Sequence, residues 1–348
     1  MTFHVGLIGA GTISRTHGRA ATELPGVEVV AVVGTNREKT AALAAEHGAA
    51  AYGALDEFLR HRPMEAVLIG SPSGVHADEA IAAARAGLHV LCEKPLDVTT
   101  ERVDAMVAEA DKAGVKLGVM FQDRTKPDLR RLKALIDGGG LGRPLLVSGR
   151  VRWWRPPEYY ASSRWRGTWA LDGGGALMNQ GVHTVDLMLW LLGDVRWVSA
   201  RTATTLHKIE VEDTAVAVLE FASGAVGTLE ATTTAYPGYP RRLDLTGSEG
   251  TVIVENDRIV AADLRTPLEG GVSTGAGDSN RLGSTHLVTD VSGHRALIED
   301  FRRAVETGGR PVCDGRDGRR SVELVQAVYR SSREGAPVLT GTSPAFRA

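Results

Sequence analysis

The sequence predicts an α/β protein in which a doubly wound parallel sheet is followed by a second domain of mostly antiparallel strands. Its 348 residues exceed the size at which one hydrophobic core usually stops growing, so two domains are expected. The first third of the chain alternates apolar runs with alanine-rich helical patterns, which is typical of a parallel sheet. Beyond about residue 122 this alternation gives way to consecutive strand patterns separated by turn signals.

The first third contains five apolar runs without strict polar alternation, as expected of strands buried on both faces. They cover residues 3–8, 27–33, 65–70, 88–92 and 115–120. Three amphipathic, alanine-rich segments lie between them, and each ends at a glycine suited to a helix C-terminus. These predicted helices cover residues 37–48, 76–87 and 101–114.

Composition and charge argue against several classes of protein. The net charge is -2 at pH 7, and no run of lysine or arginine suggests a surface that follows phosphates, so nucleic acid is not expected as a partner. Cys92 and Cys313 are too few for a disulfide framework. No segment reaches the roughly 18 apolar residues that a membrane span requires. We therefore expect a soluble, cytoplasmic protein with neither nucleic acid nor membrane as a partner.

The turn after the first predicted strand reads GAGTIS and fits a dinucleotide-binding fingerprint. Gly9 would permit the tight turn, and Gly11 would let backbone amides approach a pyrophosphate at the helix N-terminus. Ser14 occupies the third position of the fingerprint, where it is a mild departure. The motif follows a strand and opens a helix, which is the context that the fingerprint requires. We predict a nucleotide site here that includes Thr12 and Ile13; the alternative is a purely structural turn.

The end of the second predicted strand bears on which nucleotide is bound. A carboxylate at this place would hold the ribose 2′-hydroxyl. This chain instead has Thr35, Asn36 and Arg37 before the first acid, Glu38. A hydroxyl, an amide and a guanidinium suit a 2′-phosphate better, so the sequence favours NADP(H) over NAD(H). The alternative is that Asn36 only caps the next helix and that Arg37 is solvated.

Residues that directly follow the predicted strands are expected to line one crevice, because ligands bind at the carboxyl ends of parallel strands. The third strand leads into SPSGVH, the fourth into EKPL and the fifth into FQDR. The predicted crevice therefore contains Ser71, Pro72, His76, Glu93, Lys94, Gln122 and Arg124. A lysine beside a cofactor can donate to a substrate oxygen or act as an acid or base. The alternative for Lys94 is a surface pair with Glu93.

A helical pattern in the second part of the chain carries a polar stripe. In NQGVHTVDLMLWLLG, Asn179, His183, Asp186 and Trp190 fall at i, i+4, i+7 and i+11, and hence on one face of an α-helix. His183 is either presented to the crevice or a core histidine satisfied by Asp186. Further along, the polar, glycine-rich residues 266–285 are expected to form a mobile loop that could serve as a lid.

Aromatic and arginine residues are concentrated in WWRPPEYYASSRWRGTW, residues 153–169. Flat aromatic faces suit pyranose rings, and arginines suit hydroxyls or a carboxylate. We predict that at least one of Tyr160, Arg164 and Trp165 contacts the substrate. The remaining aromatic residues are expected in the core or in an interface between subunits.

Three motifs together resemble the Gfo/Idh/MocA family, which includes glucose-fructose oxidoreductase and inositol dehydrogenase. They read GLIGAGTIS, SPSGVHADEAIAAARAGLHVLCEKPL and DGGGALMNQGVHTVDLMLWLLG, and the resemblance continues to the C-terminal HRALIEDFRRAVETGGRPVCDG. It implies an N-terminal Rossmann domain and a C-terminal α/β domain with an open, mostly antiparallel sheet. The outer face of that sheet often joins subunits in this family, so a homodimer or homotetramer is expected.

The resemblance also implies roles for single residues. It makes Lys94 the catalytic-site lysine, with Lys94-Pro95 as a cis peptide, and His183 the general base. Where the best-known inositol dehydrogenase pattern has aspartate one turn before this histidine, the chain has Asn179. Asparagine can orient an imidazole but cannot stabilise its charged form as a carboxylate does. Asp186 could then hold the ring, or Lys94 could carry more of the proton transfer.

The resulting prediction is an NAD(P)-dependent oxidoreductase that interconverts a secondary alcohol and a ketone on a sugar, cyclic polyol or sugar derivative by hydride transfer. Two alternatives keep the fold: an NAD-dependent glycoside hydrolase, and a catalytically silent nucleotide-binding regulator. The Rossmann domain is expected at residues 1–122, and the substrate-binding and oligomerisation domain at residues 123–348. No metal site is expected, because none of the ten histidines lies in a ligand-like cluster with cysteines or acids.

Overall fold

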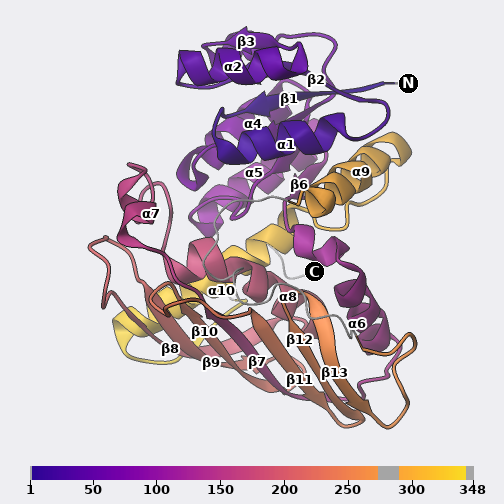
Figure 1. The fold of residues 1–348 in the computed structure, drawn as a ribbon, viewed down its shortest axis with the longest axis vertical. Helices are drawn as coiled ribbons and strands as arrows, with labels where there is room; N and C mark the ends of the chain where they lie inside the picture. Colours follow the sequence, from indigo (N-terminus) through magenta and orange to yellow (C-terminus); the bar gives the residue numbers. More distant parts are fainter. Residues whose placement is uncertain (1, 273–289, 342–348) are drawn as a thin grey trace. The chain divides into compact units, whose positions relative to one another are not determined.

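A computed structural model describes residues 2–272 and 290–341 and divides them into two compact units (Figure 1). The first unit contains the described residues up to Thr125 together with residues 290–319, and the second contains the rest. The sequence predicts a single boundary after residue 122. The contacts instead return a late segment of the chain to the first unit.

The first unit is built on a six-stranded parallel sheet with the order β3-β2-β1-β4-β5-β6. Its strands are β1 (Phe3–Ile8), β2 (Val27–Val33), β3 (Ala50–Tyr52), β4 (Ala66–Ile69), β5 (His89–Cys92) and β6 (Leu117–Val119). The predicted doubly wound sheet is confirmed, with the short β3 as an unpredicted sixth strand. The strand order reverses between β1 and β4, and such a reversal is where ligands bind in open α/β sheets.

Helices from both ends of the chain pack on this sheet. They are α1 (Thr12–Thr22), α2 (Arg37–His47), α3 (Leu55–Phe58), α4 (His76–Arg85), α5 (Thr100–Ala113) and α9 (Ser292–Thr307), with short 3₁₀ turns η1 (Ser73–Val75) and η2 (Gln122–Thr125). Helix α9 contacts α1, and its Leu297 and Phe301 lie in the same apolar core as Leu7 of β1. This shared core explains why residues 290–319 belong to the first unit.

The second unit is built on an eight-stranded sheet with the order β13-β12-β11-β7-β10-β9-β8-β14. Its strands are β7 (Pro144–Arg152), β8 (Val195–Ala203), β9 (Thr214–Phe221), β10 (Val226–Thr232), β11 (Arg242–Gly247), β12 (Gly250–Glu255), β13 (Arg258–Leu264) and β14 (Val338–Leu339). Only β7 and β10 pair in parallel, so the predicted mostly antiparallel sheet is confirmed. Most of the predicted loop 266–285 lies outside the described residues.

Helices cover one face of this second sheet. The helices of the unit are α6 (Pro127–Asp137), α7 (Pro157–Ala161), the π-helix η3 (Ala176–Gly181), α8 (Val182–Leu192) and α10 (Gly315–Glu334), of which α10 begins in the first unit. Figure 1 shows α8 and α10 on the same side of the strands. Helix α8 approaches β7 closely, since a Cβ on Gly149 would lie only 2.9 Å from the Thr184 side chain.

The segment predicted as one helix with a polar stripe consists of two elements. Asn179 lies in the π-helix, whereas His183, Asp186 and Trp190 lie in α8. A π-helix has a wider turn than an α-helix, so α-helical spacing does not extend across the junction. The predicted shared face therefore does not hold for Asn179.

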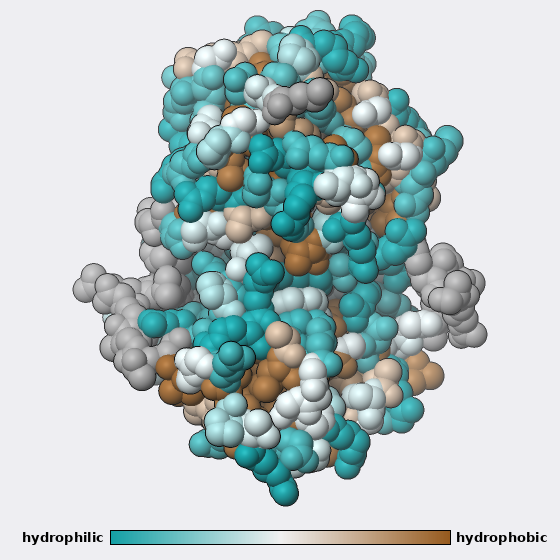
Figure 2. All heavy atoms as spheres, turned by 90° about the vertical axis from the view of Figure 1, so that its right-hand side faces the viewer, coloured by the Kyte–Doolittle hydropathy of each residue, from teal (hydrophilic) through white to brown (hydrophobic). Residues whose placement is uncertain are grey.

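The described residues contain no helix that is both long and apolar enough to cross a bilayer. On the face drawn in Figure 2, hydrophilic residues predominate and hydrophobic residues form separate patches.

Candidate functional site

The glycine turn after β1 has the geometry that its sequence predicts. Gly9 adopts a φ of 100°, and a Cβ there would lie 2.9 Å from both the Gly70 carbonyl oxygen and Ser14 Oγ. Gly11 precedes α1, makes no side-chain cap, and a Cβ there would meet no atom within 4 Å. The turn thus leaves open space beside the N-terminus of α1, as a pyrophosphate site requires. Ser14 fits because its hydroxyl donates to the Gly70 carbonyl at 3.3 Å.

Backbone hydrogen bonds align the carboxyl ends of β1, β4 and β5 with one another. The amide of Gly70 donates to the Ile8 carbonyl at 2.8 Å, and the amide of Glu93 donates to the Ile69 carbonyl at 2.9 Å. The glycine turn, the SPSGVH loop and the EKPL loop therefore leave the sheet side by side. Lys94 is the first residue beyond this ladder, and its side chain is half-buried.

The residues expected to select the nucleotide are exposed at the end of β2. Thr35, Asn36 and Arg37 all face solvent. Asn36 Oδ1 accepts a 2.9 Å hydrogen bond from the amide of Lys39, so Asn36 caps α2 as its alternative interpretation predicts. The amide nitrogen of Asn36, the Thr35 hydroxyl and the Arg37 guanidinium are the groups that could face a 2′-substituent.

His76 joins the two loops that follow β4 and β5. Its Nε2 lies 2.9 Å from the Ser71 carbonyl oxygen and its Nδ1 lies 3.0 Å from the Pro95 carbonyl oxygen. A neutral imidazole can donate to only one of them, and burial lowers the pKa of His76. The predicted Lys94-Pro95 cis peptide is confirmed. Ser71 in turn donates to Glu79, and burial raises the pKa of Glu79 to about 7.

The side chain of Glu93 is buried and points away from solvent, unlike a surface Glu-Lys pair. Its Oε1 lies 2.9 Å from Nε2 of His17 and 3.8 Å from Nε2 of His294, and its Oε2 accepts from the amide of Lys94 at 3.1 Å. Burial by itself raises the pKa of Glu93. The hydrogen bond to His17 and the charges of His17, His294 and Lys94 outweigh that effect and lower the pKa to about 2. Glu93 is therefore a carboxylate at any ordinary pH.

His17, Glu93 and His294 also have the composition of a metal site. Their ligand atoms lie within 4.8 Å of one another, and all three residues are buried. The sequence argument that no histidine lies in a ligand-like cluster with acids therefore does not hold for the folded chain. The 2.9 Å contact between His17 and Glu93 is equally a complete hydrogen bond without an ion.

Two further residues of the predicted crevice have structural contacts. The start of α9 packs on Gln122, because a Cβ on Gly293 would lie 3.2 Å from Gln122 Cβ. Arg124 is only 2% exposed; it donates to the Val312 carbonyl at 3.2 Å and pairs with Asp317 at 3.3 Å. These contacts hold the guanidinium inside the first unit, and a substrate contact by Arg124 stays a prediction.

In the second unit, Asn179 belongs to a hydrogen-bonded chain of polar side chains. Its Nδ2 donates to Asp172 Oδ1 at 2.5 Å, and its Oδ1 accepts from Gln180 Nε2 at 2.8 Å. Gln180 also donates to the Tyr159 hydroxyl at 3.0 Å and accepts from Arg155 at 2.9 Å. A carboxylate is thus present beside Asn179 after all, supplied by Asp172 of the DGGG motif.

The aromatic segment divides into core and accessible side chains. Tyr160 is 9% exposed, and its hydroxyl lies 2.9 Å from Thr233 Oγ1. Arg164 is exposed, and Trp165 is half-buried beneath the guanidinium of Arg166 at 5.2 Å. Tyr159, the neighbour of Tyr160, is not among the predicted substrate contacts. It is the tyrosine whose hydroxyl accepts from Gln180 and so joins the hydrogen-bonded chain that contains Asn179.

His183 stands in the first turn of α8, where it is half-buried, whereas Asp186 one turn later is 1% exposed. Trp190 lies under the ammonium of Lys133 at 5.9 Å. Of the two titratable residues of α8, His183 is therefore partly accessible to solvent, whereas Asp186 is not. A substrate contact by His183 stays a prediction.

The buried side chain of Glu212 accepts hydrogen bonds from backbone amides at the start of the π-helix. Glu212 Oε2 accepts from the amide of Gly175 at 2.9 Å, and its Oε1 accepts from the amide of Leu177 at 2.8 Å and from the Tyr329 hydroxyl at 2.9 Å. Gly175 has no room for a side chain, because a Cβ would lie 1.8 Å from the Glu212 carbonyl oxygen. Burial raises the pKa of Glu212 to about 7 against these hydrogen bonds.

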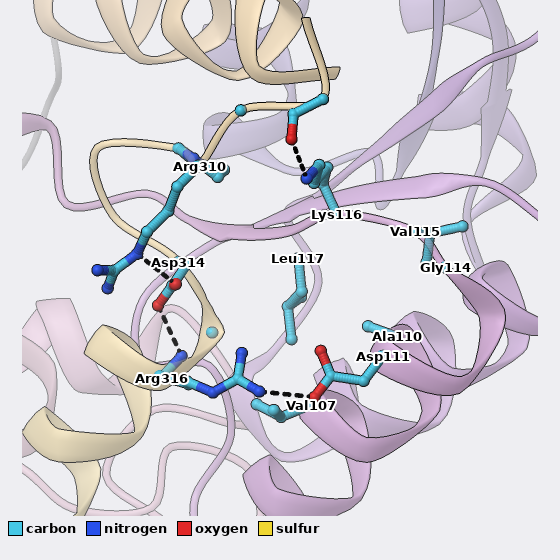
Figure 3. Close-up of a pocket in the computed structure, with 14 residues that line it drawn as sticks. Val107, Ala110, Asp111, Gly114, Val115, Lys116, Leu117, Arg310, Asp314 and Arg316 are labelled. Atoms are coloured by element: carbon cyan, nitrogen blue, oxygen red, sulfur yellow. Dashed lines mark hydrogen bonds and ion pairs between the residues drawn. The ribbon is translucent and has the colours of Figure 1, made fainter. Parts of the chain in front are cut away.

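One hollow of the first unit lies away from these residues. It has a volume of about 470 Å³ and is lined by the end of α5, by residues 114–117, and by residues 308–311 and 314–316, the last two of which begin α10 (Figure 3). Lys116, which precedes β6, donates there to the Gly308 carbonyl at 2.9 Å. The hollow thus opens at the amino ends of the strands, on the opposite edge from Lys94, and is not the predicted nucleotide site.

Comparison with known families agrees with this two-part construction. Residues 3–121 match the family model described as an oxidoreductase family with an NAD-binding Rossmann fold, and residues 129–253 match the Gfo/Idh/MocA C-terminal domain. The chain belongs to the Gfo/Idh/MocA oxidoreductase family. The resemblance stated from the three motifs is thereby confirmed.

Named relatives within the Gfo/Idh/MocA family are similar over nearly the whole chain. A 1,5-anhydro-D-fructose reductase from Ensifer adhaerens is 30% identical, with 97% of this chain and 98% of the relative covered. An inositol 2-dehydrogenase from Rhizobium meliloti is 29% identical, with 96% and 98% covered. The WlbA dehydrogenase of Bordetella pertussis, solved with NADH and UDP-GlcNAcA, is 35% identical, with a TM-score of 0.87 and 97% and 99% covered.

Glu212 gives a pH dependence of stability that can be measured. Its pKa is higher in the folded protein than the ordinary value of 4.5, so the stabilisation is complete below pH 4.5 and is lost as the pH rises through about 7. We expect Glu212→Gln to make the fall in Tm between pH 5 and pH 8 smaller by about 5 °C, measured by calorimetry. The control is Glu210→Gln, an exposed carboxylate two residues earlier. An equal fall in both variants would contradict the assignment.

Proposed function

We propose that this protein is an NAD(P)-dependent oxidoreductase that interconverts a secondary alcohol and a ketone on a sugar, cyclic polyol or sugar derivative. The observation that carries the proposal is the shared edge of the parallel sheet, where the glycine turn before α1 follows β1 and the loop with Lys94 follows β5, with only β4 between these two strands. Membership of the Gfo/Idh/MocA family supports it. So do its relatives, which are named as a 1,5-anhydro-D-fructose reductase and an inositol 2-dehydrogenase.

The first unit binds the nucleotide and supplies Lys94. The amides at the start of α1 bind the pyrophosphate, with Gly9 and Gly11 keeping the turn clear. The nicotinamide, when bound, supplies the hydride acceptor or donor. The Lys94 ammonium donates to the oxygen of the reacting carbon, which polarises a ketone or steadies an alkoxide.

The second unit recognises the sugar. The chain of Asp172, Asn179, Gln180, Tyr159 and Arg155 offers acceptors and donors of the kind that sugar hydroxyls require. The half-exposed Trp165 and the exposed Arg164 supply an aromatic face and a cation, as the sequence predicts. His183 acts as the proton acceptor or donor, a role that an imidazole side chain can fill.

The proposal is tested by turnover on a panel that includes myo-inositol, 1,5-anhydro-D-fructose and UDP-GlcNAcA, with NAD(P)H absorbance as the readout. We expect Lys94→Ala to lower kcat by roughly 10²–10⁴-fold, the range for a lost acid or base, while the Kd for NAD(P)H changes less than about twofold. Lys112→Ala is the matched control, because its ammonium is 79% exposed on α5. Equal losses of kcat and nucleotide affinity would refute the role of Lys94.

The two alternative functions give different results in the same assay. A glycoside hydrolase would release sugar without accumulating reduced or oxidised nucleotide. A silent regulator would bind nucleotide without turnover on any sugar. The relatives described above are named as reductases and dehydrogenases, which favours the main proposal.

We infer a preference for NADP(H) from the exposed ends of β2 and α2. Thr35, Asn36 and Arg37 present no carboxylate to a ribose 2′-hydroxyl, and Arg37 is free to meet a 2′-phosphate. The binding of NAD(H) or NADP(H) as a class follows from the fold, whereas the choice between them depends on these side chains.

The preference is measured by fluorescence titration with NADPH and NADH. We expect NADPH to bind more tightly, and Arg37→Gln to weaken NADPH binding by about tenfold, the loss of one charge-assisted hydrogen bond, while NADH binding stays the same. Arg60→Gln, an exposed arginine of the same unit, should change neither. Tighter NADH binding that is indifferent to Arg37 would refute the preference.

We further propose that a second copy of the chain covers the outer face of the eight-stranded sheet. Leu146, Val216, Val218 and Val226 are about half exposed there. Arg152 and Glu230 form an ion pair across the neighbouring strands β7 and β10, so the face carries both charges and can be complementary to itself. A cytoplasmic location, and the absence of nucleic-acid and membrane partners, stay predictions from composition.

Light scattering after size exclusion tests this assembly. We expect a homodimer or homotetramer for the unsubstituted protein and a smaller species for Val218→Asp, because a carboxylate would be buried without a partner. Leu206→Asp is the control, since Leu206 is 54% exposed in the loop between β8 and β9. A monomeric unsubstituted protein would exclude the proposal.

A further inference from the structure

The cluster of His17, Glu93 and His294 is assembled from three separate parts of the first unit. His17 comes from α1, Glu93 follows β5, and His294 lies in the first turn of α9. Their residues are 0%, 6% and 3% exposed. Taking a carboxylate out of water is costly unless it is paired, so the two imidazoles that face Glu93 are required partners and not incidental neighbours.

The two carboxylate oxygens of Glu93 have different hydrogen-bond partners. Oε1 faces the histidines, at 2.9 Å from His17 and 3.8 Å from His294, and Oε2 accepts from the amide of Lys94 at 3.1 Å. The backbone ladder of the sheet reaches the amide of Glu93, and the amide of Lys94, the next one along the chain, donates to this carboxylate. The next residue, Pro95, has no amide to donate.

We propose that His17 and His294 are positioning residues for Lys94: they hold the Glu93 carboxylate in one orientation, and that carboxylate fixes the backbone from which the Lys94 ammonium extends. The catalytic meaning of this positioning rests on the role of Lys94 given under Proposed function. His294 is the more informative of the two, because it reaches the cluster through the packing of α9, a late segment of the chain, on α1 and β5. The two imidazole rings lie with centroids 5.8 Å apart.

The positioning is tested without any substrate by the amide spectrum of ¹⁵N-lysine-labelled protein, with the Lys94 signal assigned from Lys94→Arg. We expect His294→Leu to shift or broaden the Lys94 amide signal, and His294→Asn, which keeps a donor, to restore it in large part. His89→Leu is the matched control: His89 begins β5 at its other end and accepts from the amide of Lys116 at 2.9 Å. That variant loses a histidine hydrogen bond from the same strand and should leave Lys94 unchanged.

A Lys94 amide signal that is the same in His294→Leu and in the unsubstituted protein would overturn the proposal. So would a tightly bound divalent metal in the purified protein that is lost in His294→Leu, because the three residues would then be a metal site. These outcomes do not depend on which sugar is turned over.

Turnover adds the catalytic readout. With a sugar from the panel, His294→Leu should lower kcat roughly 10- to 100-fold, as expected of a displaced catalytic group, with the Kd for NAD(P)H unchanged and His294→Asn intermediate. A shifted Lys94 amide with undiminished kcat would support the positioning and refute the catalytic role of Lys94. The two proposals therefore fail in distinguishable ways.

Discussion

A carboxylate buried at the end of a central strand is the constraint on which the first unit depends. Glu93 directly follows β5 and its side chain is buried, so the carboxylate needs cationic or hydrogen-bonding partners within reach. One partner, His17, comes from the helix that follows the glycine turn, and the other, His294, comes from α9, which lies about two hundred residues further along the chain. The Glu93 carboxylate thus contacts α1, which follows the glycine turn, the loop that contains Lys94, and α9 from the late part of the chain.

The second unit also contains a buried acidic side chain, and this one holds backbone amides of the π-helix. Glu212 is buried beneath the π-helix and accepts from the amides of Gly175 and Leu177. A π-helix is less stable than an α-helix, and its amides need acceptors when they are buried. Because this anchor holds the start of the π-helix, Asn179 and Gln180 are presented to their partners instead of continuing the face of α8.

The sequence predicts the features that depend on local pattern. Strands β1 and β2 agree with their predicted bounds because runs buried on both faces have a clear apolar signature, and Gly9 is recognisable because its turn demands a positive φ. It does not predict the π-helix, or the meeting of His294 with Glu93, since both arise from packing between distant segments. A buried acid in EKP and a histidine in the C-terminal helix give no signal of their contact until α9 is placed on α1.

The most direct test of the central claim follows the hydride itself. Nucleotide carrying deuterium at both hydrogen positions of C4 of the nicotinamide, as NADPH and as NADH, is incubated with the protein and a mixture of keto sugars, and the sugars are analysed by mass spectrometry. We expect one sugar to gain a single deuterium at the carbon that becomes an alcohol, in proportion to nucleotide oxidised. Nucleotide that is bound but leaves every sugar unlabelled would contradict it.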